Sequence, residues 1–186
     1  MREKCRLALI HHPTLDKTGR EITSAFTALD LHDLARLART YGLDGVFAQT
    51  NLPEQERIFR KLTAHWVKGY GAEYNPNRKE ALEILELVPS LEAASGRMEE
   101  KWGVRPLILA TSARLDGPER MTYASARARL EAEDAPALII FGTGWGLAPS
   151  VIAQCDFVIE PIGSPVGYNH LSVRSAASIT VDRLFG

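Results

Sequence analysis

Short apolar runs alternate with segments of helical period along most of the chain, and this alternation most strongly limits the folds open to it. Such alternation is typical of an α/β protein, with a mostly parallel sheet that has helices on both faces. The runs of strand length cover residues 5–11, 44–50, 85–88, 105–111, 137–141 and 157–162. The segments of helical period cover residues 31–41, 53–66, 75–85, 90–103, 123–133 and 171–185.

Capping residues support several of these boundaries. Gly42 follows the first helical segment, where a left-handed glycine commonly ends a helix. Pro53 suits the first turn of the second, and Asn75 with Pro76 forms a typical start for the third. Between the last two, residues 65–71 are expected to form a further short strand.

Length and composition indicate one domain over residues 1–186. Hydrophobic residues make up 45% and charged residues 24%, as in ordinary globular proteins. A formal net charge of −1 argues against a whole-molecule electrostatic grip on nucleic acid but allows a local basic patch. No apolar run approaches the roughly 18 residues of a membrane helix, so we expect a cytoplasmic protein. No metal site is expected, because the two cysteines lack metal-ligand spacing and His11 and His12 have no clustered carboxylate beside them.

A glycine-rich loop follows the apolar run at residues 137–141, with glycines at 142, 144 and 146. A dinucleotide fingerprint needs G-x-G-x-x-G and a full helix after it, but here Pro149 and then another strand follow almost at once. The Walker lysine is also missing. The loop therefore favours an uncharged, adenosine-like ligand held by main-chain groups, unless its glycines only form a tight turn.

Two more strand ends near this loop carry small or polar residues, in "LATSAR" and in "IEPIGSPVGYNHLSVRSA". Ligands of open α/β sheets bind at the carboxyl ends of strands, so these ends and the glycine loop are expected to form one pocket. The last segment is the richest in groups able to fix a ligand, namely Tyr168, Asn169, His170, Ser172 and Arg174.

These segments resemble the motifs of the SPOUT superfamily of S-adenosylmethionine-dependent RNA methyltransferases. "YNHLSVRSAASI" is similar to the third motif: His170 stands where the family usually has asparagine, and the motif's serine is kept at Ser172. "LIIFGTGWGL" is similar to the second motif. The first motif of the SpoU branch, N-x-G-x-x-x-R with a later glycine, keeps Arg36 and Gly42 but has an aspartate at position 30 and His32 at the first two places. The resemblance runs from about residue 30 to the C-terminus. Within the superfamily, the chain looks most like the compact, stand-alone domains described as similar to tRNA guanine-N1 methyltransferases.

The resemblance implies methylation of tRNA or rRNA at a base nitrogen or a ribose 2′-oxygen, with S-adenosylmethionine as cofactor. It implies a deep trefoil knot over about residues 105–186, a rare exception to the rule that connections do not thread loops. It also implies a homodimer whose active site is completed across the interface by the first-motif arginine.

The resemblance also assigns roles to individual residues. The expected cofactor-binding residues are Thr111, Ser112, Phe141, Gly142, Thr143, Gly144, Ile159, Glu160, Pro161, Ile162, Leu171 and Ser175. The expected catalytic residues are Arg36, Asp30, His32, Asn169, His170 and Ser172. Arg36 would hold a phosphate or help a ribose hydroxyl to ionise, and Asp30 with His32 would act as general base. Without the motif, the residues alone favour a solvated arginine on a helix face at Arg36, whereas Asp30 is equally a helix cap and His32 a surface residue.

A basic and aromatic stretch offers a surface for RNA. Residues 57–79 hold six Lys or Arg against one acidic residue, and Trp66, Tyr70 and Tyr74 interleave with them. The stretch suits phosphates and bases, or it is a solvated helix face whose aromatic side chains belong to the core. Two other functions stay open: a knotted protein that binds RNA or S-adenosylmethionine without catalysis, and a nucleotide-cofactor oxidoreductase.

Overall fold

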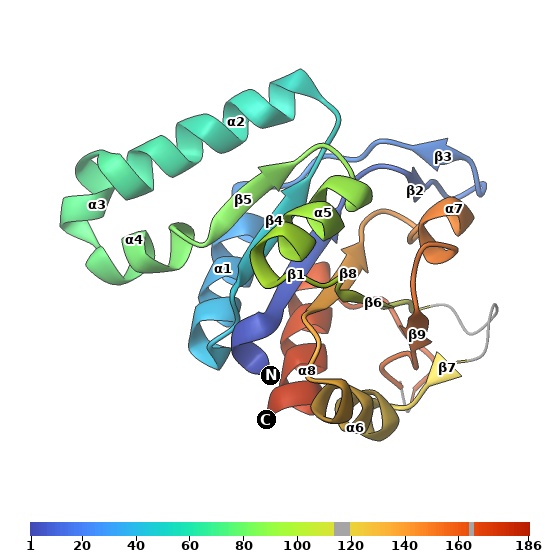
Figure 1. Cartoon of the computed structure of the whole chain (residues 1–186). Coiled ribbons are helices and arrows are strands. Elements are labelled where there is room, and N and C mark those ends of the chain that lie inside the picture. The colour runs from blue at the N-terminus through green and yellow to red at the C-terminus, as the bar shows by residue number, and fades with distance from the viewer. Residues whose placement is uncertain (114–119, 164–165) are drawn as a thin grey trace.

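A single parallel sheet organises the protein, which is seen here as a computed structural model that describes residues 1–113, 120–163 and 166–186. Within these residues, seven strands lie in the order β5-β4-β1-β8-β6-β9-β7 (Figure 1). All their pairings are parallel, as the strand–helix alternation predicts. The strands are β1 (Cys5–Ile10), β4 (Gly45–Gln49), β5 (Leu85–Val88), β6 (Leu107–Ala110), β7 (Arg120–Met121), β8 (Ala137–Gly142) and β9 (Phe157–Ile159).

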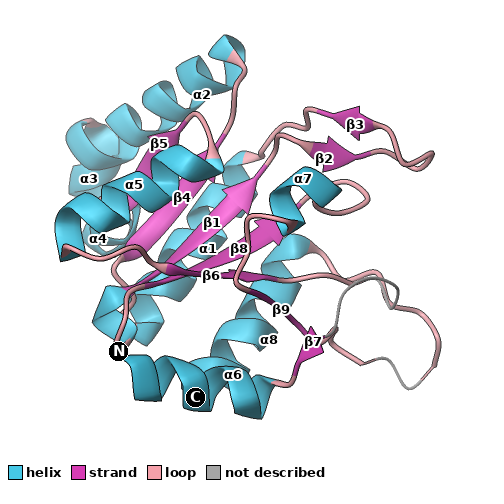
Figure 2. Cartoon of the chain, turned by 45° about the vertical axis from the view of Figure 1, so that its right-hand side comes forward, coloured by secondary structure: helices cyan, strands magenta, loops and turns pink. Residues whose placement is uncertain are grey.

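Helices cover both faces of the sheet, which confirms the predicted architecture (Figure 2). Leu7 and Leu9 of β1 pack into one hydrophobic core with residues of α1, α6 and α8. Ala8 and Ile10 face the other side and pack with residues of α5 and α7. Since successive side chains of a strand point to opposite faces, the continuous apolar run of β1 supplies both cores. The helices concerned are α1 (Ala28–Tyr41), α5 (Leu91–Trp102), α6 (Tyr123–Glu133), α7 (Pro149–Ile152) and α8 (Val173–Phe185).

The predicted helix boundaries are explained by their caps. Gly42 takes a left-handed conformation with φ of 68° and ends α1. Pro53 opens α2 (Pro53–Thr63), and the Asn75 side chain accepts a hydrogen bond from the Arg78 N–H at the start of α4 (Pro76–Leu82). These short-range signals act within one turn of helix, so they can be read directly from the sequence.

The strand expected at residues 65–71 is wrong, because this segment is helical. A π-helical turn at Ala64–Lys68 continues α2, and α3 (Tyr70–Tyr74) follows it. The turn contains Trp66, and Gly71 lies so close to that ring that a Cβ there would be 2.7 Å from it. We call residues 53–82 the helical arm; Figure 1 shows it reaching away from the sheet on the side of β5.

A small hairpin near the N-terminus was not expected from the sequence. Its antiparallel strands, β2 (Thr14–Leu15) and β3 (Glu21–Ile22), have two residues each and give no apolar run to detect. The Leu15 N–H donates to the Gly146 carbonyl at 2.9 Å, and the Trp145 N–H donates to the Leu15 carbonyl at 2.9 Å. The hairpin is therefore bonded directly to the glycine-rich loop after β8.

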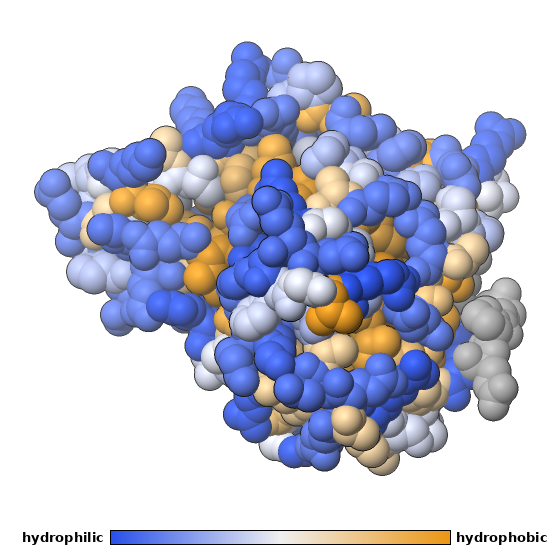
Figure 3. Space-filling view, viewed as in Figure 1, coloured by the Kyte–Doolittle hydropathy of each residue, from blue (hydrophilic) through white to orange (hydrophobic). Residues whose placement is uncertain are grey.

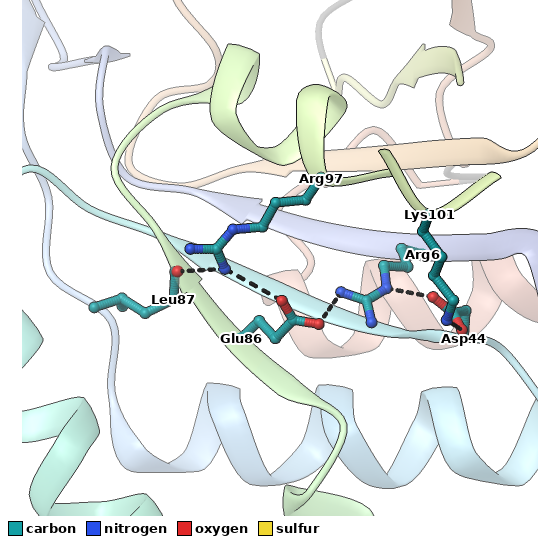
Figure 4. Close-up of polar contacts among 6 residues, drawn as sticks. All are labelled: Arg6, Asp44, Glu86, Leu87, Arg97 and Lys101. Carbon is teal, nitrogen blue, oxygen red and sulfur yellow. Dashed lines mark hydrogen bonds and ion pairs between the residues drawn. The ribbon is translucent and has the colours of Figure 1, made fainter. Parts of the chain in front are cut away.

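A network of ion pairs lies toward the amino ends of β1, β4 and β5 (Figure 4). Arg6 is only 8% exposed, and its Nε donates to Asp44 at 2.6 Å while its Nη1 donates to Glu86. Lys101 pairs with Asp44, and Arg97 pairs with Glu86 at 3.2 Å. The buried guanidinium is thus neutralised at the amino ends of the strands, away from the carboxyl ends where a ligand is expected.

The described helices are also too short or too polar to cross a bilayer.

Candidate active site

A cavity of about 770 Å³ opens at the carboxyl ends of β6, β8 and β9. We call it the deep cavity. The loops that follow these three strands line it, and residues of α6 and α8 complete its wall. Its position is the one expected for a ligand site in an open α/β sheet.

The glycine-rich loop forms one wall with bare backbone. A Cβ at Gly142 would lie 2.9 Å from both the Cγ and the backbone nitrogen of Leu147. Gly144 has φ of +60°, and a Cβ there would lie 2.9 Å from the Leu15 carbonyl oxygen. The loop therefore requires glycine at both positions, and these glycines present backbone without side chains to the cavity.

The loop is also fixed in place from behind. The Thr143 hydroxyl donates to the Ile10 carbonyl at 3.3 Å and bonds to the Ser24 hydroxyl. The Gly146 N–H closes the turn onto the Thr143 carbonyl at 3.1 Å. Together with the two bonds to the hairpin, these contacts hold this wall of the cavity in a fixed conformation.

The opposite wall joins the segments after β6 and β9. The Tyr123 N–H donates to the Glu160 carboxylate at 3.1 Å, and the Tyr123 hydroxyl lies 3.2 Å from that of Thr180. The Asn169 side chain donates to the Ala113 carbonyl at 3.1 Å. These bonds hold the residues that follow β9 against the loop that follows β6.

The chemistry of the deep cavity suits an adenosine with a cationic tail. Among the described residues that line it, none is Lys or Arg, so a pyrophosphate would find no cationic partner there. Hydroxyls, main-chain groups and the apolar side chains of Phe141, Ile162 and Leu171 dominate the lining. Glu160 is the carboxylate among these residues.

A second, more open hollow of about 490 Å³ lies between α1 and the start of α8, and we call it the α1–α8 hollow. The beginning of α8 separates it from the deep cavity. Leu171 and Val173 line the deep cavity, whereas Ser172 and Arg174 line the α1–α8 hollow. The beginning of α8 is therefore a wall common to both sites.

Two arginines give the α1–α8 hollow its charge. Arg174 is paired, with its Nε 3.4 Å from Asp30 and its Nη1 3.2 Å from Asp33. Arg36 is exposed, and its guanidinium forms no ion pair with any residue that the structure describes. Arg36 is thus available to bind an anion such as a phosphate.

The structure gathers most of the expected cofactor residues around the deep cavity. Those that line it are Thr111, Ser112, Phe141, Gly142, Thr143, Gly144, Glu160, Ile162 and Leu171. Ile159 is fully buried in the core, Pro161 is outside the lining, and Ser175 lines the α1–α8 hollow instead.

The expected catalytic residues divide between the two sites. Asn169 and His170 line the deep cavity, and Arg36 and Ser172 line the α1–α8 hollow. Sequence reasoning did not select Tyr123, Thr180 and Trp145, which also line the deep cavity. Trp145 could have been chosen because it lies inside the glycine loop, whereas the other two lie on helices and follow no motif.

Asp30 and His32 have structural partners and line neither site. The Asp30 carboxylate accepts from the Thr27 N–H at 3.0 Å and completes a capping box at the start of α1. The His32 ring packs edge-on against Trp66 at 5.4 Å, and partial burial, with Arg78 nearby, lowers its pKa below 6.5. They do not bond to one another, and the general-base role expected for this pair remains a prediction.

Comparison with known proteins agrees with this geometry. Residues 4–186 match the family described as SAM-dependent RNA methyltransferase. The chain is 42% identical over 179 residues to a tRNA (guanine-N(1)-)-methyltransferase of Oleidesulfovibrio alaskensis, covering 96% of this chain and 41% of that protein. It is 36% identical over 183 residues to an uncharacterized protein of Aquifex aeolicus, covering 98% of this chain and 89% of that one.

A solved structure shows the same fold. The TrmH/SpoU tRNA modifying enzyme of A. aeolicus superposes with a TM-score of 0.58 at 12% identity, covering 98% of this chain and 74% of that one. Because the chain spans only 41% of the tRNA methyltransferase of O. alaskensis, the activity named for that relative describes a much longer protein. The match to nearly the whole chain and the shared fold lead to one conclusion: the chain belongs to the family of SAM-dependent RNA methyltransferases and has the SPOUT fold of SpoU-type enzymes.

Proposed function

We propose that the protein transfers a methyl group from S-adenosylmethionine to a nucleotide of structured RNA, with tRNA as the first substrate to test. The observation that carries the proposal is the deep cavity with its glycine wall, which adjoins a hollow containing an unpaired arginine. The tRNA methyltransferase among the relatives supports the choice of tRNA. The acceptor is a base nitrogen or a ribose 2′-oxygen.

The deep cavity fits the cofactor through residues that the structure places there. S-adenosylmethionine supplies a methyl group activated by a sulfonium, so the protein has to bind, orient and exclude water. Main-chain groups of Gly142, Thr143 and Gly144 would hold the adenosine, and Ile162 and Leu171 would contact its apolar faces. Glu160 would favour a positively charged ligand in the same cavity.

The acceptor nucleotide would be held where the two sites meet. Arg36 would bind an RNA phosphate in the α1–α8 hollow, and Ser172 lies in that hollow at the N-terminal cap of α8. His170 lines the deep cavity and would accept the proton that the acceptor atom releases. Its ring lies edge-on to Tyr168 at 5.2 Å, and Asn169 anchors the same segment through its bond to Ala113.

Three finer features belong to this proposal. The hydrogen bonds of Tyr123 with Glu160 and of Asn169 with Ala113 support a trefoil knot, and an experimental structure tracing residues 105–186 tests it. A homodimer in which Arg36 acts in the partner's site, rather than in the site of its own protomer, is tested by mixing two inactive variants, Arg36→Ala and Gly142→Val: recovery of activity supports it. A cytoplasmic location is the one where tRNA is available, and cell fractionation tests it.

The decisive experiment is mass spectrometry of nucleosides from cellular tRNA and rRNA, with and without the protein. The proposal expects one methylated nucleoside to disappear and to return when purified protein and S-adenosylmethionine are added. Binding of RNA and cofactor without methyl transfer would identify a non-catalytic binding protein. Thermal stabilisation by NAD but not by S-adenosylhomocysteine would identify an oxidoreductase.

A matched pair of variants tests the role of Arg36. Arg36→Ala should lower methyl transfer by about 100-fold or more while the Kd for S-adenosylmethionine stays unchanged, because the residue lies outside the deep cavity. Arg39→Ala is the control, since Arg39 lies on the same helix but is paired with Glu80 at 2.8 Å. Equal activity of the two variants contradicts the assignment.

A further inference from the structure

Two tyrosines on the helical arm form an exposed aromatic surface. Tyr70 and Tyr74 lie one turn apart on α3 and are 72% and 74% exposed. Their ring centroids are 6.1 Å apart and the rings are inclined by only 26°, so one tyrosine stacks on the other. The sequence left open whether these aromatic residues belong to the core, and their exposure shows that they do not.

The arm holds this surface rigidly on α1. Trp66 is packed against His32 of α1 at 5.4 Å, against His65 at 4.9 Å and beneath the Arg78 guanidinium at 4.5 Å. Gly71, within α3, allows that helix to approach the Trp66 ring closely. The tyrosine pair is therefore attached, through Trp66, to the helix that carries Arg36.

The same arm carries two cationic side chains without acidic partners among the described residues. Lys61 and Lys68 are exposed and form no ion pair with the residues that the structure describes. By contrast, Arg57 and Arg60 are neutralised by glutamates on their own helix. Figure 3 shows that the visible side of the arm is mainly hydrophilic, with small apolar spots rather than a broad apolar patch.

We propose that this surface, formed by Tyr70, Tyr74, Lys61 and Lys68, binds an unpaired stretch of the substrate RNA. A base stacks on the tyrosine pair, and the lysines contact the phosphates on either side of it. Exposed aromatic rings on the same arm as unneutralised cations match the chemistry of single-stranded RNA, whereas a second copy of the chain would need a wider apolar area. This inference rests on the proposed function, in which RNA is the substrate.

The place of the arm determines which part of the RNA it contacts. The arm lies on the β5 side of the sheet, whereas β9 and β7 lie at the other edge, beside the deep cavity (Figure 1). Within one protomer, the arm therefore binds nucleotides away from the one that is methylated. Its contribution should consequently appear in RNA affinity and KM, not in kcat.

The test compares two double variants of the full chain. Tyr70→Leu/Tyr74→Leu keeps apolar side chains but removes the aromatic faces, whereas Tyr70→Phe/Tyr74→Phe keeps the faces and removes only the hydroxyls. With fluorescently labelled total tRNA as probe, the leucine variant should raise the Kd by about 5- to 150-fold, as expected for the loss of one stacked base. The phenylalanine variant should stay within about twofold of the wild type, and melting temperature and Kd for S-adenosylmethionine should not change in either.

Salt dependence tests the lysines separately. Lys61→Ala and Lys68→Ala should each reduce the slope of log K against log salt by about 0.7, the effect of one lost contact with a single strand. Arg57→Ala is the matched control because that guanidinium is paired with Glu54 on the same helix. Slopes that are the same for all three variants contradict the lysine contacts.

The outcomes separate this inference from the proposed function. If the wild type methylates RNA and the leucine variant does so with the same KM, the arm does not bind RNA although the function stands. If the leucine variant instead changes the oligomeric state in size-exclusion chromatography with unchanged RNA affinity, the surface is a contact between copies and the inference is overturned. If the wild type neither binds nor methylates RNA, the proposed function itself fails.

Discussion

Gly142→Ala tests whether the glycine wall contributes to cofactor binding, as we propose. The added Cβ would lie 2.9 Å from the backbone nitrogen of Leu147 and 3.0 Å from its Cδ2. The side chain of Leu147 can rotate away, but its backbone cannot, because Leu147 forms a bridge with Thr14 of the hairpin. The loop must therefore shift by several tenths of an ångström.

The size of the effect follows from the cost of forcing the loop back. Inserting a methyl group into a well-packed site costs about 1–3 kcal/mol. A shifted loop relieves this strain in the free protein, and the ligand has to restore it on binding. Affinity for S-adenosylmethionine should therefore fall by about 5- to 150-fold.

Isothermal titration calorimetry with S-adenosylmethionine and S-adenosylhomocysteine measures this loss. Gly96→Ala in α5 is the matched control, since no atom lies within 4 Å of the added Cβ. That change should raise the free energy of unfolding by about 0.5–1 kcal/mol, because alanine is a better helix former, and should leave both affinities unchanged. A folded Gly142→Ala protein that binds the cofactor within twofold of wild type refutes the assignment of this wall.

The remaining predictions concern charge and pH. Glu160→Gln should weaken binding of S-adenosylmethionine about fivefold relative to S-adenosylhomocysteine, which lacks the sulfonium charge, since the change removes about 1 kcal/mol of attraction for a cation. Equal losses for both ligands contradict this. Asp44→Asn/Glu86→Gln removes both carboxylates that pair with Arg6, which is 8% exposed. The free energy of unfolding measured in urea should fall by about 3–5 kcal/mol, and cofactor affinity should not change. A loss below about 1 kcal/mol is evidence that the buried guanidinium does not depend on these carboxylates. Burial lowers the pKa of His11 below 6.5, so the unfolded chain takes up a proton that the folded chain excludes as the pH falls through 6.5. Stability should therefore decrease on acidification below about pH 6.5, and His11→Asn, which cannot titrate, should make urea midpoints between pH 7 and 5 flatter.

The parallel sheet and its glycine wall could be predicted because their signals are local. Runs such as residues 137–141 are long enough to identify a buried strand, and Gly142 and Gly144 follow directly where the sheet places ligands. The cap at Gly42 likewise depends on the conformation of a single residue.

The middle of the arm and two helical residues of the cavity wall could not be predicted, because they depend on contacts between distant residues. Residues 65–71 resemble a strand in isolation, and only the packing of Trp66 against His32 and Arg78 explains the helical turn. Tyr123 and Thr180 reach the deep cavity from two helices and bond to each other across most of the last third of the chain. No spacing rule relates two such positions, so the sequence gives no signal for them.

The two hydrogen bonds between Leu15 and the glycine loop also bear on when the glycine wall can form. They join segments separated by most of the chain, and bringing such segments together costs loop-closure entropy. The pairing of β1 with β8 already brings them together, so the two bonds form only after it. We expect the loop to order in the final kinetic step of folding, after the pairing of β1 with β4. Pulsed hydrogen exchange tests this order: the Trp145 amide should gain protection later than the amides of β4, and simultaneous protection contradicts it. A chain still emerging from the ribosome would then lack the glycine wall until the loop after β8 had been made and had bonded to the hairpin.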